Sequence, residues 1–405
     1  MFKSEIGQDF KSFRLVCLIL LIGMLPLWMG GYCMYVLITL LPLSLLYIRK
    51  IDGTCLSVIA FSLIYTLFQY VNGHPYTGSS LIFDLTFPFI VYQVGTYIVT
   101  RQKSPKSAVL SLCLIAIALA LPVILVNVKD TITTGQMINV ERVITGESDE
   151  EARSATGYGM MLAILDGCFG IILLKPSGKF DSRLKIAVAI MSCLALFATI
   201  HLLNRTGIVL AAISILCVVL LPPYSFKKIV YTVVSLILVG GITIYFLEDS
   251  KFYIDAINFY EARDSGSGSV NSFGGRSPLW EDGIKQLSTK PLGNDKGVYI
   301  AGHYKYAHNM WLDTGIVAGI PAMMILIWIG IIYIQSLIKM YRLKYLNQFE
   351  KNLLILIGVA MFLQLNTEPA IQGVYQFFLY FIFFISIINN MNKKYGRRFA
   401  INTKS

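Results

Sequence analysis

The sequence predicts an all-α integral membrane protein with about twelve transmembrane helices and both termini in the cytoplasm. Hydrophobic residues make up 56% of the 405 residues and charged residues only 14%, whereas soluble domains are about half apolar and a quarter charged. The apolar residues gather in blocks of about 17–25 residues, long enough to cross roughly 30 Å of hydrocarbon as a helix. The predicted spans are residues 14–30, 32–48, 54–71, 81–99, 107–128, 155–174, 185–203, 206–222, 229–247, 309–333, 353–366 and 373–390.

The distribution of Lys and Arg among the connections predicts the orientation. With the N-terminus inside, the cytoplasmic connections hold 23 of the 34 basic residues, as the positive-inside rule requires. The short outside turns at 72–80 and 367–372 hold none. The net charge of +11 therefore reflects the excess of Lys and Arg in the cytoplasmic connections of a membrane protein. We expect no nucleic-acid partner.

The N-terminus, the cysteines and the histidines exclude several classes of protein. The first span is expected to be a signal anchor, because the segment before it carries both signs of charge and no small-residue cleavage site. All seven cysteines lie within or at the edge of apolar spans, so no disulfide framework is expected. Four histidines without an HExxH pattern predict no protein-bound metal, and no cofactor is expected.

Two outer loops interrupt what we expect to be a single polytopic membrane domain, residues 1–405. The loop at 129–154 ends in acidic residues. The larger loop, 248–308, is expected to carry part of an active site, since loops of this length are usually functional or disordered. It contains an aromatic segment at 251–263, predicted to lie on the membrane surface as a helix, and a Gly/Ser linker at 264–275.

A short helix is predicted after the linker, in the stretch RSPLWEDGIKQLSTKPLG. Ser277 is a suitable N-cap, and Pro278 suits the first helical position. Trp280, Ile284 and Leu287 fall at i, i+4 and i+7 and form one apolar stripe. We expect this stripe to bury against the membrane domain.

Four charged residues stand out as candidate functional groups. Arg276 precedes the short helix, whose N-terminus favours anions; the ordinary alternative is a solvent-exposed loop arginine. Arg205 lies in a very short turn between two apolar runs. It either binds a diphosphate or carboxylate or snorkels to the membrane interface. Asp84 and Asp166 are intramembrane acids, which are functional by default in such a setting.

His308 stands directly before the apolar run at 309–333. It is a candidate catalytic residue, and the alternative is a histidine that faces water at a helix start. Gly315 and Gly319 are predicted to share one helix face, which would let another helix approach closely and hold the first turns in place. His303 is a second candidate and otherwise an ordinary loop residue.

Together these motifs resemble the O-antigen ligase and polymerase superfamily of bacterial envelope glycan enzymes. The motifs that carry the resemblance are Asn204-Arg205-Thr206-Gly207, Gly275-Arg276-Ser277-Pro278-Leu279-Trp280, Pro291-Leu292-Gly293, His308-Asn309 and, less strongly, Ser154-Ala155-Thr156-Gly157-Tyr158-Gly159. The resemblance covers roughly residues 150–335, and the N-terminal third matches in topology only.

The resemblance implies a metal-independent, inverting glycosyltransferase with a fold of the membrane glycosyltransferase C type. Its donor would be a glycan on undecaprenyl diphosphate at the outer face of the bacterial cytoplasmic membrane. Arg205 and Arg276 would neutralise the diphosphate, and His308 would act as general base or orient the acceptor hydroxyl. The expected substrate-binding residues are Asn309, Trp280 and His303.

The acceptor separates two interpretations. A polymerase extends an O-antigen or capsule repeat unit, and a ligase transfers the glycan to the lipid A core of lipopolysaccharide. A pattern more typical of ligases is met at His308, Asn309 and Gly319 but not at Ala322, which favours the polymerase. The spacing from Arg263 to Gly274 resembles a polymerase pattern. Further expected partners are membrane lipid, a chain-length regulator and a flippase.

A flippase for lipid-linked sugars is a more distant alternative. Many transporters are built from internal repeats with broken midplane helices, and the sequence shows no evident repeat. Its unusual polar residues lie on one predicted side, which favours a single-sided enzyme. A structural scaffold would not need Arg205.

Overall fold

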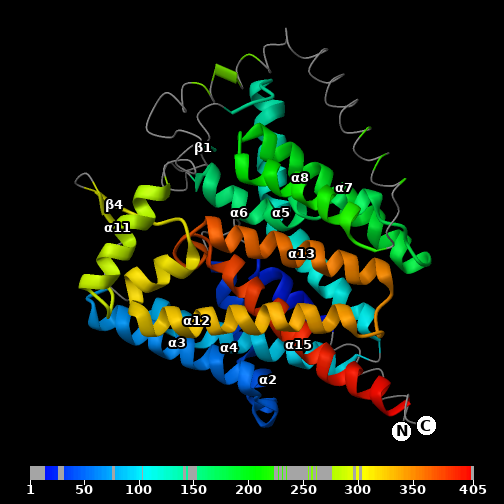
Figure 1. The fold of residues 1–405 in the computed structure, drawn as a ribbon, viewed down its shortest axis with the longest axis horizontal. Coiled ribbons are helices and arrows are strands. Elements are labelled where there is room, and N and C mark those ends of the chain that lie inside the picture. The colour runs from blue at the N-terminus through cyan, green and yellow to red at the C-terminus, as the bar shows by residue number, and fades with distance from the viewer. Residues whose placement is uncertain are drawn as a thin grey trace. The chain divides into compact units, whose positions relative to one another are not determined.

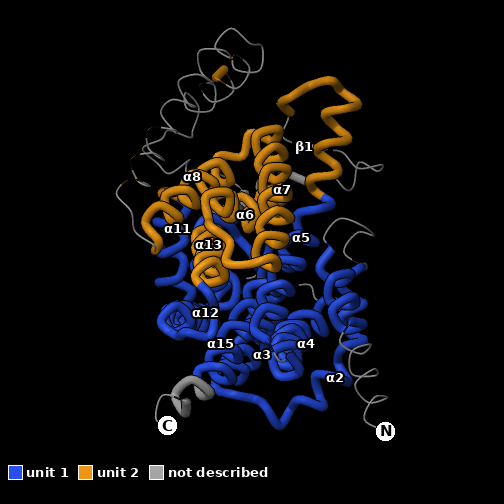
Figure 2. The backbone as a smooth tube through the Cα atoms, turned by 90° about the vertical axis from the view of Figure 1, so that its right-hand side faces the viewer, with its two compact units in different colours: residues 1–122, 279–347, 365–405 blue, residues 123–278, 348–364 orange. Residues whose placement is uncertain are grey.

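The chain divides into two compact units, coloured separately in Figure 2. The structure, a computed structural model, describes residues 14–25, 32–74, 78–102, 104–139, 143–144, 153–222, 276–294, 298–300 and 303–402, and a few isolated positions between 227 and 261. Unit 1 comprises residues 1–122, 279–347 and 365–405, and unit 2 comprises residues 123–278 and 348–364.

Four helices of unit 1, labelled in Figure 1, each pack against two of the others and so form a ring. α3 (Gly53–Val71) packs against α4 (Gly78–Arg101) and α12 (Met310–Arg342). α15 (Tyr375–Asn402) packs against α4 and α12 and so closes the ring. Every residue of α15 from 376 to 388 is buried, as expected for a helix that is apolar on all sides. α15 therefore forms the core of the unit.

Shorter elements complete unit 1. They are an apolar helix at Arg14–Gly23, the 3-10 helices Tyr32–Leu40 and Ile48–Lys50, α2 (Leu41–Leu46), most of α11 (Arg276–Thr289), β3 (Val298–Ile300), β4 (His303–Lys305) and α14 (Ala370–Gly373). β3 and β4 form an antiparallel hairpin in which Ile300 pairs with His303. This hairpin lies between α11 and α12 in the sequence.

Unit 2 is built on α6, α7 and α8, each of which packs against the other two. Its elements are the end of α5 (Pro105–Thr134), β1 (Val143–Ile144), β2 (Arg153–Ser154), α6 (Ala155–Asp166), a 3-10 helix at Phe169–Leu173, α7 (Lys179–His201), α8 (Arg205–Leu220) and most of α13 (Gln348–Thr367). α5 continues through Thr134, so the outer loop predicted at 129–154 begins at Gly135.

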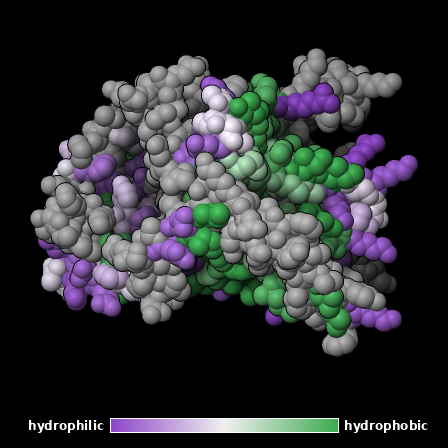
Figure 3. Space-filling view, turned by 90° about the horizontal axis from the view of Figure 1, so that it is seen from above, coloured by the Kyte–Doolittle hydropathy of each residue, from purple (hydrophilic) through white to green (hydrophobic). Residues whose placement is uncertain are grey.

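The chain is a multi-pass helical membrane protein. In the described part, six helices are long and apolar enough to cross a membrane, and shorter apolar helices accompany them. On the face shown in Figure 3, hydrophobic side chains gather in patches, and hydrophilic groups lie beside them. Helices coincide with every predicted span except 229–247. That span and the predicted surface helix and linker at 251–275 lie outside the described residues, apart from a few isolated positions. The total of twelve spans stays a prediction.

α12 is broken at Gly319. The backbone there has φ 81° and ψ 168°, a region that essentially only glycine adopts. Pro321 follows and has no N–H to offer the carbonyl of Val317. The side-chain amide of Asn72 donates to that carbonyl instead, at 3.2 Å. Gly319 and Pro321 therefore specify the break, and Asn72 at the end of α3 supplies the hydrogen bond that the Val317 carbonyl would otherwise lack within the helix.

A turn at residues 291–294, here named the docking turn, closes the break. In a continuous helix the N–H of Ile320 would donate to the carbonyl of Ile316. Here the N–H of Ile320 donates to the carbonyl of Pro291, and the N–H of Asn294 donates to the carbonyl of Ile316, both at 2.8 Å. Backbone polar groups in a membrane need hydrogen-bond partners. The docking turn therefore supplies partners for the Ile320 N–H and the Ile316 carbonyl, which the break separates from each other.

This geometry corrects the prediction that Gly315 and Gly319 share one helix face. Gly319 interrupts the helix, so the four-residue spacing no longer places the two glycines together. Gly315 does permit close approach, because a Cβ built there would lie 3.2 Å from the side chain of Leu287 in α11.

The predicted short helix exists as α11, with two corrections. It begins at Arg276, so Ser277 lies inside its first turn and is not the N-cap. Leu287 is 7% exposed, but Ile284 is 61% exposed and does not belong to the packed stripe. Gly283 takes its place, since a Cβ there would lie 2.9 Å from the side chain of Ile316 in α12.

Substitution of Gly319 by alanine tests the break. Gly319→Ala is expected to lower the free energy of unfolding by about 1–3 kcal/mol, because the new Cβ would be strained and would lie 2.7 Å from the backbone of Leu292. Gly53→Ala is the control, since no atom lies within 4 Å of its Cβ position. Thermal unfolding in detergent should show a lower Tm for the first variant only. Equal Tm values for both would contradict the role given to the docking turn.

Candidate active site

His308 is held in an unusual backbone conformation at the start of α12. Its φ is 54°, in the left-handed region that costs a non-glycine residue about 1–2 kcal/mol. The buried carboxylate of Asp313 accepts from the N–H groups of Ala307 at 2.6 Å and Asn309 at 2.9 Å, on either side of His308. Asn309 then caps α12 by accepting from the N–H of Leu312 at 3.1 Å. The first turn of the helix thus fixes His308.

His308 forms a pair with Glu368. Its Nδ1 donates to Glu368 Oε2 at 2.9 Å, and the side chains are 30% and 4% exposed, respectively. An ionised carboxylate only accepts, so Nδ1 is the donor in this bond. An imidazole with its proton on Nδ1 carries a lone pair on Nε2. A partly exposed imidazole backed by a buried carboxylate has the arrangement of a general base and its orienting group.

Asn366 ties the turn that carries Glu368 to α12. Its backbone carbonyl accepts from Asn309 Nδ2 at 3.2 Å, and its side-chain oxygen accepts from Trp311 Nε1 at 3.1 Å. Sequence reasoning missed both Asn366 and Glu368. The signal available for Glu368 was a single acidic residue in a short turn that is predicted to lie outside and holds no basic residue.

Trp280 touches the segment immediately before His308. Its indole N–H donates to the carbonyl of Ala307 at 2.8 Å. The surrounding cluster consists of Leu287, Ala307 and Ile316 with Trp280, Leu312 and Met323. Because the N–H is already used, Trp280 offers a substrate only the faces of its ring.

Tyr306 and His303 precede His308 on the same segment. Burial, and secondly the Asp313 carboxylate, raise the pKa of Tyr306 above its ordinary value, so its hydroxyl stays protonated and can donate. His303 is the first residue of β4. Among the predicted site residues, unit 1 thus brings together His308, Asn309 and Trp280, because Trp280 bonds to Ala307 directly before His308.

Arg276 is the first residue of α11, one turn before Trp280 in the same helix. It is half-buried, and it belongs to unit 2, whereas α11 from Leu279 onward belongs to unit 1. A positive side chain at a helix N-terminus opposes the helix dipole. The position of Arg276 is therefore unfavourable for the helix unless an anion lies close to the guanidinium.

Arg205 is the first residue of α8 in unit 2. It follows the C-terminal cap of α7 and the N-terminal cap of α8. Leu203 has φ 50° and Asn204 N–H donates to the carbonyl of Thr199 at 3.0 Å, as in a Schellman turn that ends a helix. Asn204 then caps α8 by accepting from the N–H of Gly207 at 3.2 Å. Only residues 202–204 separate α7 from α8, and this short connection sets Arg205 at the start of α8.

Two glycines let this turn pack tightly. A Cβ on Gly159 of α6 would overlap the side-chain amide of Asn204, and one on Gly207 would lie 2.5 Å from Asp166 Oδ2. Asp166 is fully buried and accepts from Thr199 Oγ1 at 2.7 Å. Asp166, one of the two acids predicted to lie within the membrane, therefore joins α6 to α7. The other, Asp84, is half-buried in α4 of unit 1.

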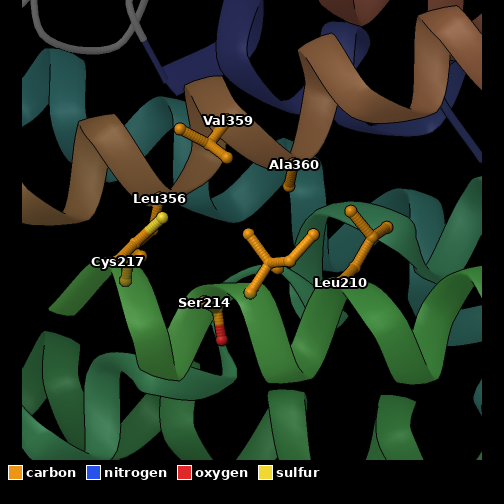
Figure 4. Close-up of a pocket in the computed structure, with 8 residues that line it drawn as sticks. Leu210, Ser214, Cys217, Leu356, Val359 and Ala360 are labelled. Atoms are coloured by element: carbon orange, nitrogen blue, oxygen red, sulfur yellow. The ribbon is translucent and has the colours of Figure 1, made fainter. Parts of the chain in front are cut away.

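A gap in unit 2 does not qualify as a ligand site. Figure 4 shows side chains of α8 and α13 facing each other across it, among them Leu210, Cys217 and Leu356. It has no room for a water molecule. Among the residues that the structure describes, no group of three or more His, Cys, Asp or Glu side chains is arranged to hold a metal ion.

The fold and these residues define a multi-pass helical membrane protein with a histidine–carboxylate pair at the start of a broken helix. Residues 187–327 match the family model described as O-antigen ligase. The match includes α8, α11 and the break of α12, and it confirms the predicted relation to the O-antigen ligase and polymerase superfamily. It supports an activity of the ligase or polymerase type. A search of the curated proteins found no match to this chain.

Alanine substitutions in α6 test the packing beneath Arg205. Gly159→Ala is expected to displace the Asn204 cap and lower the free energy of unfolding by about 1–3 kcal/mol. Gly157→Ala is the matched control in the same helix, because its Cβ position has no neighbour within 4 Å. Thermal unfolding of both variants distinguishes them. A Gly159→Ala protein as stable as Gly157→Ala would contradict the close contact with Asn204.

Proposed function

We propose that this protein is a glycan polymerase of the O-antigen or capsule type. It takes a glycan from undecaprenyl diphosphate and transfers it to a hydroxyl of another lipid-linked repeat unit at the outer face of the bacterial cytoplasmic membrane. The observation that carries the proposal is the pair of His308 and Glu368, in which a buried carboxylate orients a partly exposed imidazole.

The proposed reaction uses His308 as general base. The acceptor hydroxyl oxygen attacks the anomeric carbon of the donor, and Nε2 of His308 takes the hydroxyl proton. Glu368 stabilises the imidazolium that forms. The bond between the anomeric carbon and the diphosphate oxygen breaks, and its electron pair leaves with the diphosphate. Attack from the side opposite the leaving group inverts the anomeric carbon.

The diphosphate requires neutralisation, and we assign this role to Arg205 and Arg276. Each is the first residue of a helix, where the helix dipole already favours an anion. A guanidinium can bind two phosphate oxygens at once. The two arginines would therefore lower the cost of the negative charge that develops on the leaving group.

The remaining candidates would position the sugars. Asn309 uses its side chain for the helix cap and for Asn366, so its proposed contribution is to hold the backbone at His308. The ring of Trp280 suits stacking on a sugar face, and His303 stays a candidate in the first position of β4.

The ligase is the second candidate. It shares this chemistry and differs in its acceptor, the lipid A core. Ala322 stands where the ligase-associated pattern has another residue, and this departure is the reason for proposing the polymerase.

The histidine–glutamate pair is tested by reconstituting the purified protein with a lipid-linked single repeat unit. His308→Asn is expected to lower transfer by at least about 100-fold, while Asn tolerates the left-handed backbone and preserves the fold. Glu368→Gln is expected to lower it by more than about tenfold. Glu281→Gln, at an exposed position in α11, is the control and should keep full activity. Full transfer by a folded His308→Asn protein would overturn the proposal.

The arginines are tested by measuring the concentration of donor needed for half-maximal transfer. Arg205→Ala and Arg276→Ala should each weaken donor use by about 10- to 100-fold, the usual range for a lost charged hydrogen bond. The corresponding lysine variants should recover part of the loss, since they keep the charge without the planar fork. Arg183→Ala, exposed in α7, is the control. Unchanged donor dependence in both alanine variants would exclude diphosphate binding by these residues.

A further inference from the structure

Unit 1 contains an open pocket that is rich in positive charge. Its volume is about 540 Å³. The pocket is lined by Tyr47, Arg49, Lys50, Tyr97 and Arg101, with Leu43 and Leu46 of α2 completing the wall. These lining residues carry three positive charges and no negative charge. The composition points to an anionic ligand.

The pocket lies at the opposite end of α3 from the docking turn. α3 starts three residues after Lys50 and ends beside Asn72, whose side chain donates to Val317 in the first part of α12. A 19-residue helix is about 28 Å long. The pocket therefore lies across the membrane from His308, on the side for which the Lys and Arg distribution predicts the cytoplasm.

Tyr47 organises two of the cations. Arg101 Nε donates to the Tyr47 hydroxyl at 3.2 Å, and Lys50 Nζ lies 5.0 Å from the centre of the Tyr47 ring. Tyr97 packs edge-on against Tyr47 with ring centres 5.5 Å apart. These contacts hold the cations beside the pocket. The bond to Tyr47 uses one of the five N–H donors of Arg101.

Neighbouring charges are engaged with other groups. Asp52, two residues after Lys50, accepts from the Tyr92 hydroxyl at 2.9 Å and forms an ion pair with Lys393. Lys394 donates to the carbonyls of Val99, at 2.7 Å, and Thr100, at 3.0 Å, near the end of α4. That lysine thus meets the negative end of the α4 dipole. None of these neighbouring groups lines the pocket.

We propose that this pocket binds the headgroup of an anionic phospholipid from the cytoplasmic leaflet. Basic pockets between membrane helices on this side suit acidic lipid headgroups. A soluble phosphate has the same recognition chemistry, but the leucines favour a lipid. Leu46 is 78% exposed and Leu45 50% exposed, which offers acyl chains an apolar surface beside the cations. The site is independent of the glycan-transfer proposal.

The test measures lipid retained by the protein in native mass spectrometry. Wild-type protein in mixed phosphatidylglycerol and phosphatidylcholine should retain phosphatidylglycerol preferentially. A variant with Arg49→Gln, Lys50→Gln and Arg101→Gln should lose this retention by more than about tenfold, since each cation contributes about fivefold. The matched control carries Lys339→Gln, Arg342→Gln and Lys344→Gln, three exposed cations on the same predicted side. It should retain phosphatidylglycerol like wild type. Equal retention by the pocket variant and the control would overturn the proposal.

A thermal-shift measurement separates a lipid from a soluble anion. Phosphatidylglycerol should raise the Tm of wild type and not that of the pocket variant, with both Tm values equal in phosphatidylcholine alone. If inorganic phosphate raises the wild-type Tm as much as the lipid does, and does so only with the pocket intact, the lipid assignment is wrong. Should the triple variant fail to fold, Lys50→Gln alone, at an exposed position, should reduce retention about fivefold.

Discussion

The break in α12 at Gly319 is the constraint on which the arrangement around His308 depends. A broken helix in a membrane leaves backbone groups that must find partners. The docking turn supplies bonds to Ile316 and Ile320, and Asn72 supplies one to Val317. Because the docking turn directly follows α11, closing the break also fixes α11 against the first part of α12. The motif Pro291-Leu292-Gly293 therefore has a structural explanation that does not require contact with substrate.

Both motifs that lead into a candidate helix share one local design. In each, a non-glycine residue with positive φ stands directly before an asparagine N-cap: Leu203 before Asn204, and His308 before Asn309. The conformation is unfavourable in both places, and packing or a helix cap offsets its cost. In unit 2 the result is an arginine at the first helical position. In unit 1 the strained residue is itself the candidate base.

Local patterns predicted most of the helices and the residues at helix starts. The apolar blocks identified the helices because a membrane imposes a length and a composition. The motifs at Asn204 and His308 were recognisable since each precedes an apolar run. Glu368 was missed because its partner lies 60 positions away in the sequence. The prediction made from the glycine spacing at 315 and 319 was wrong because it assumed a continuous helix. Pro321 and the docking turn exclude one. Arg205 belongs to the other unit, so its role beside His308 stays a prediction.

The most direct test of glycan polymerisation is a gel profile of surface and lipid-linked glycans from cells with and without this gene. If the protein is a polymerase, loss of the gene removes the ladder of long glycans and leaves single repeat units attached to the envelope anchor. Loss of all attached glycan, with long polymer remaining on the polyprenyl carrier, would contradict the polymerase and assign the ligase. An unchanged profile would contradict glycan transfer by this protein altogether.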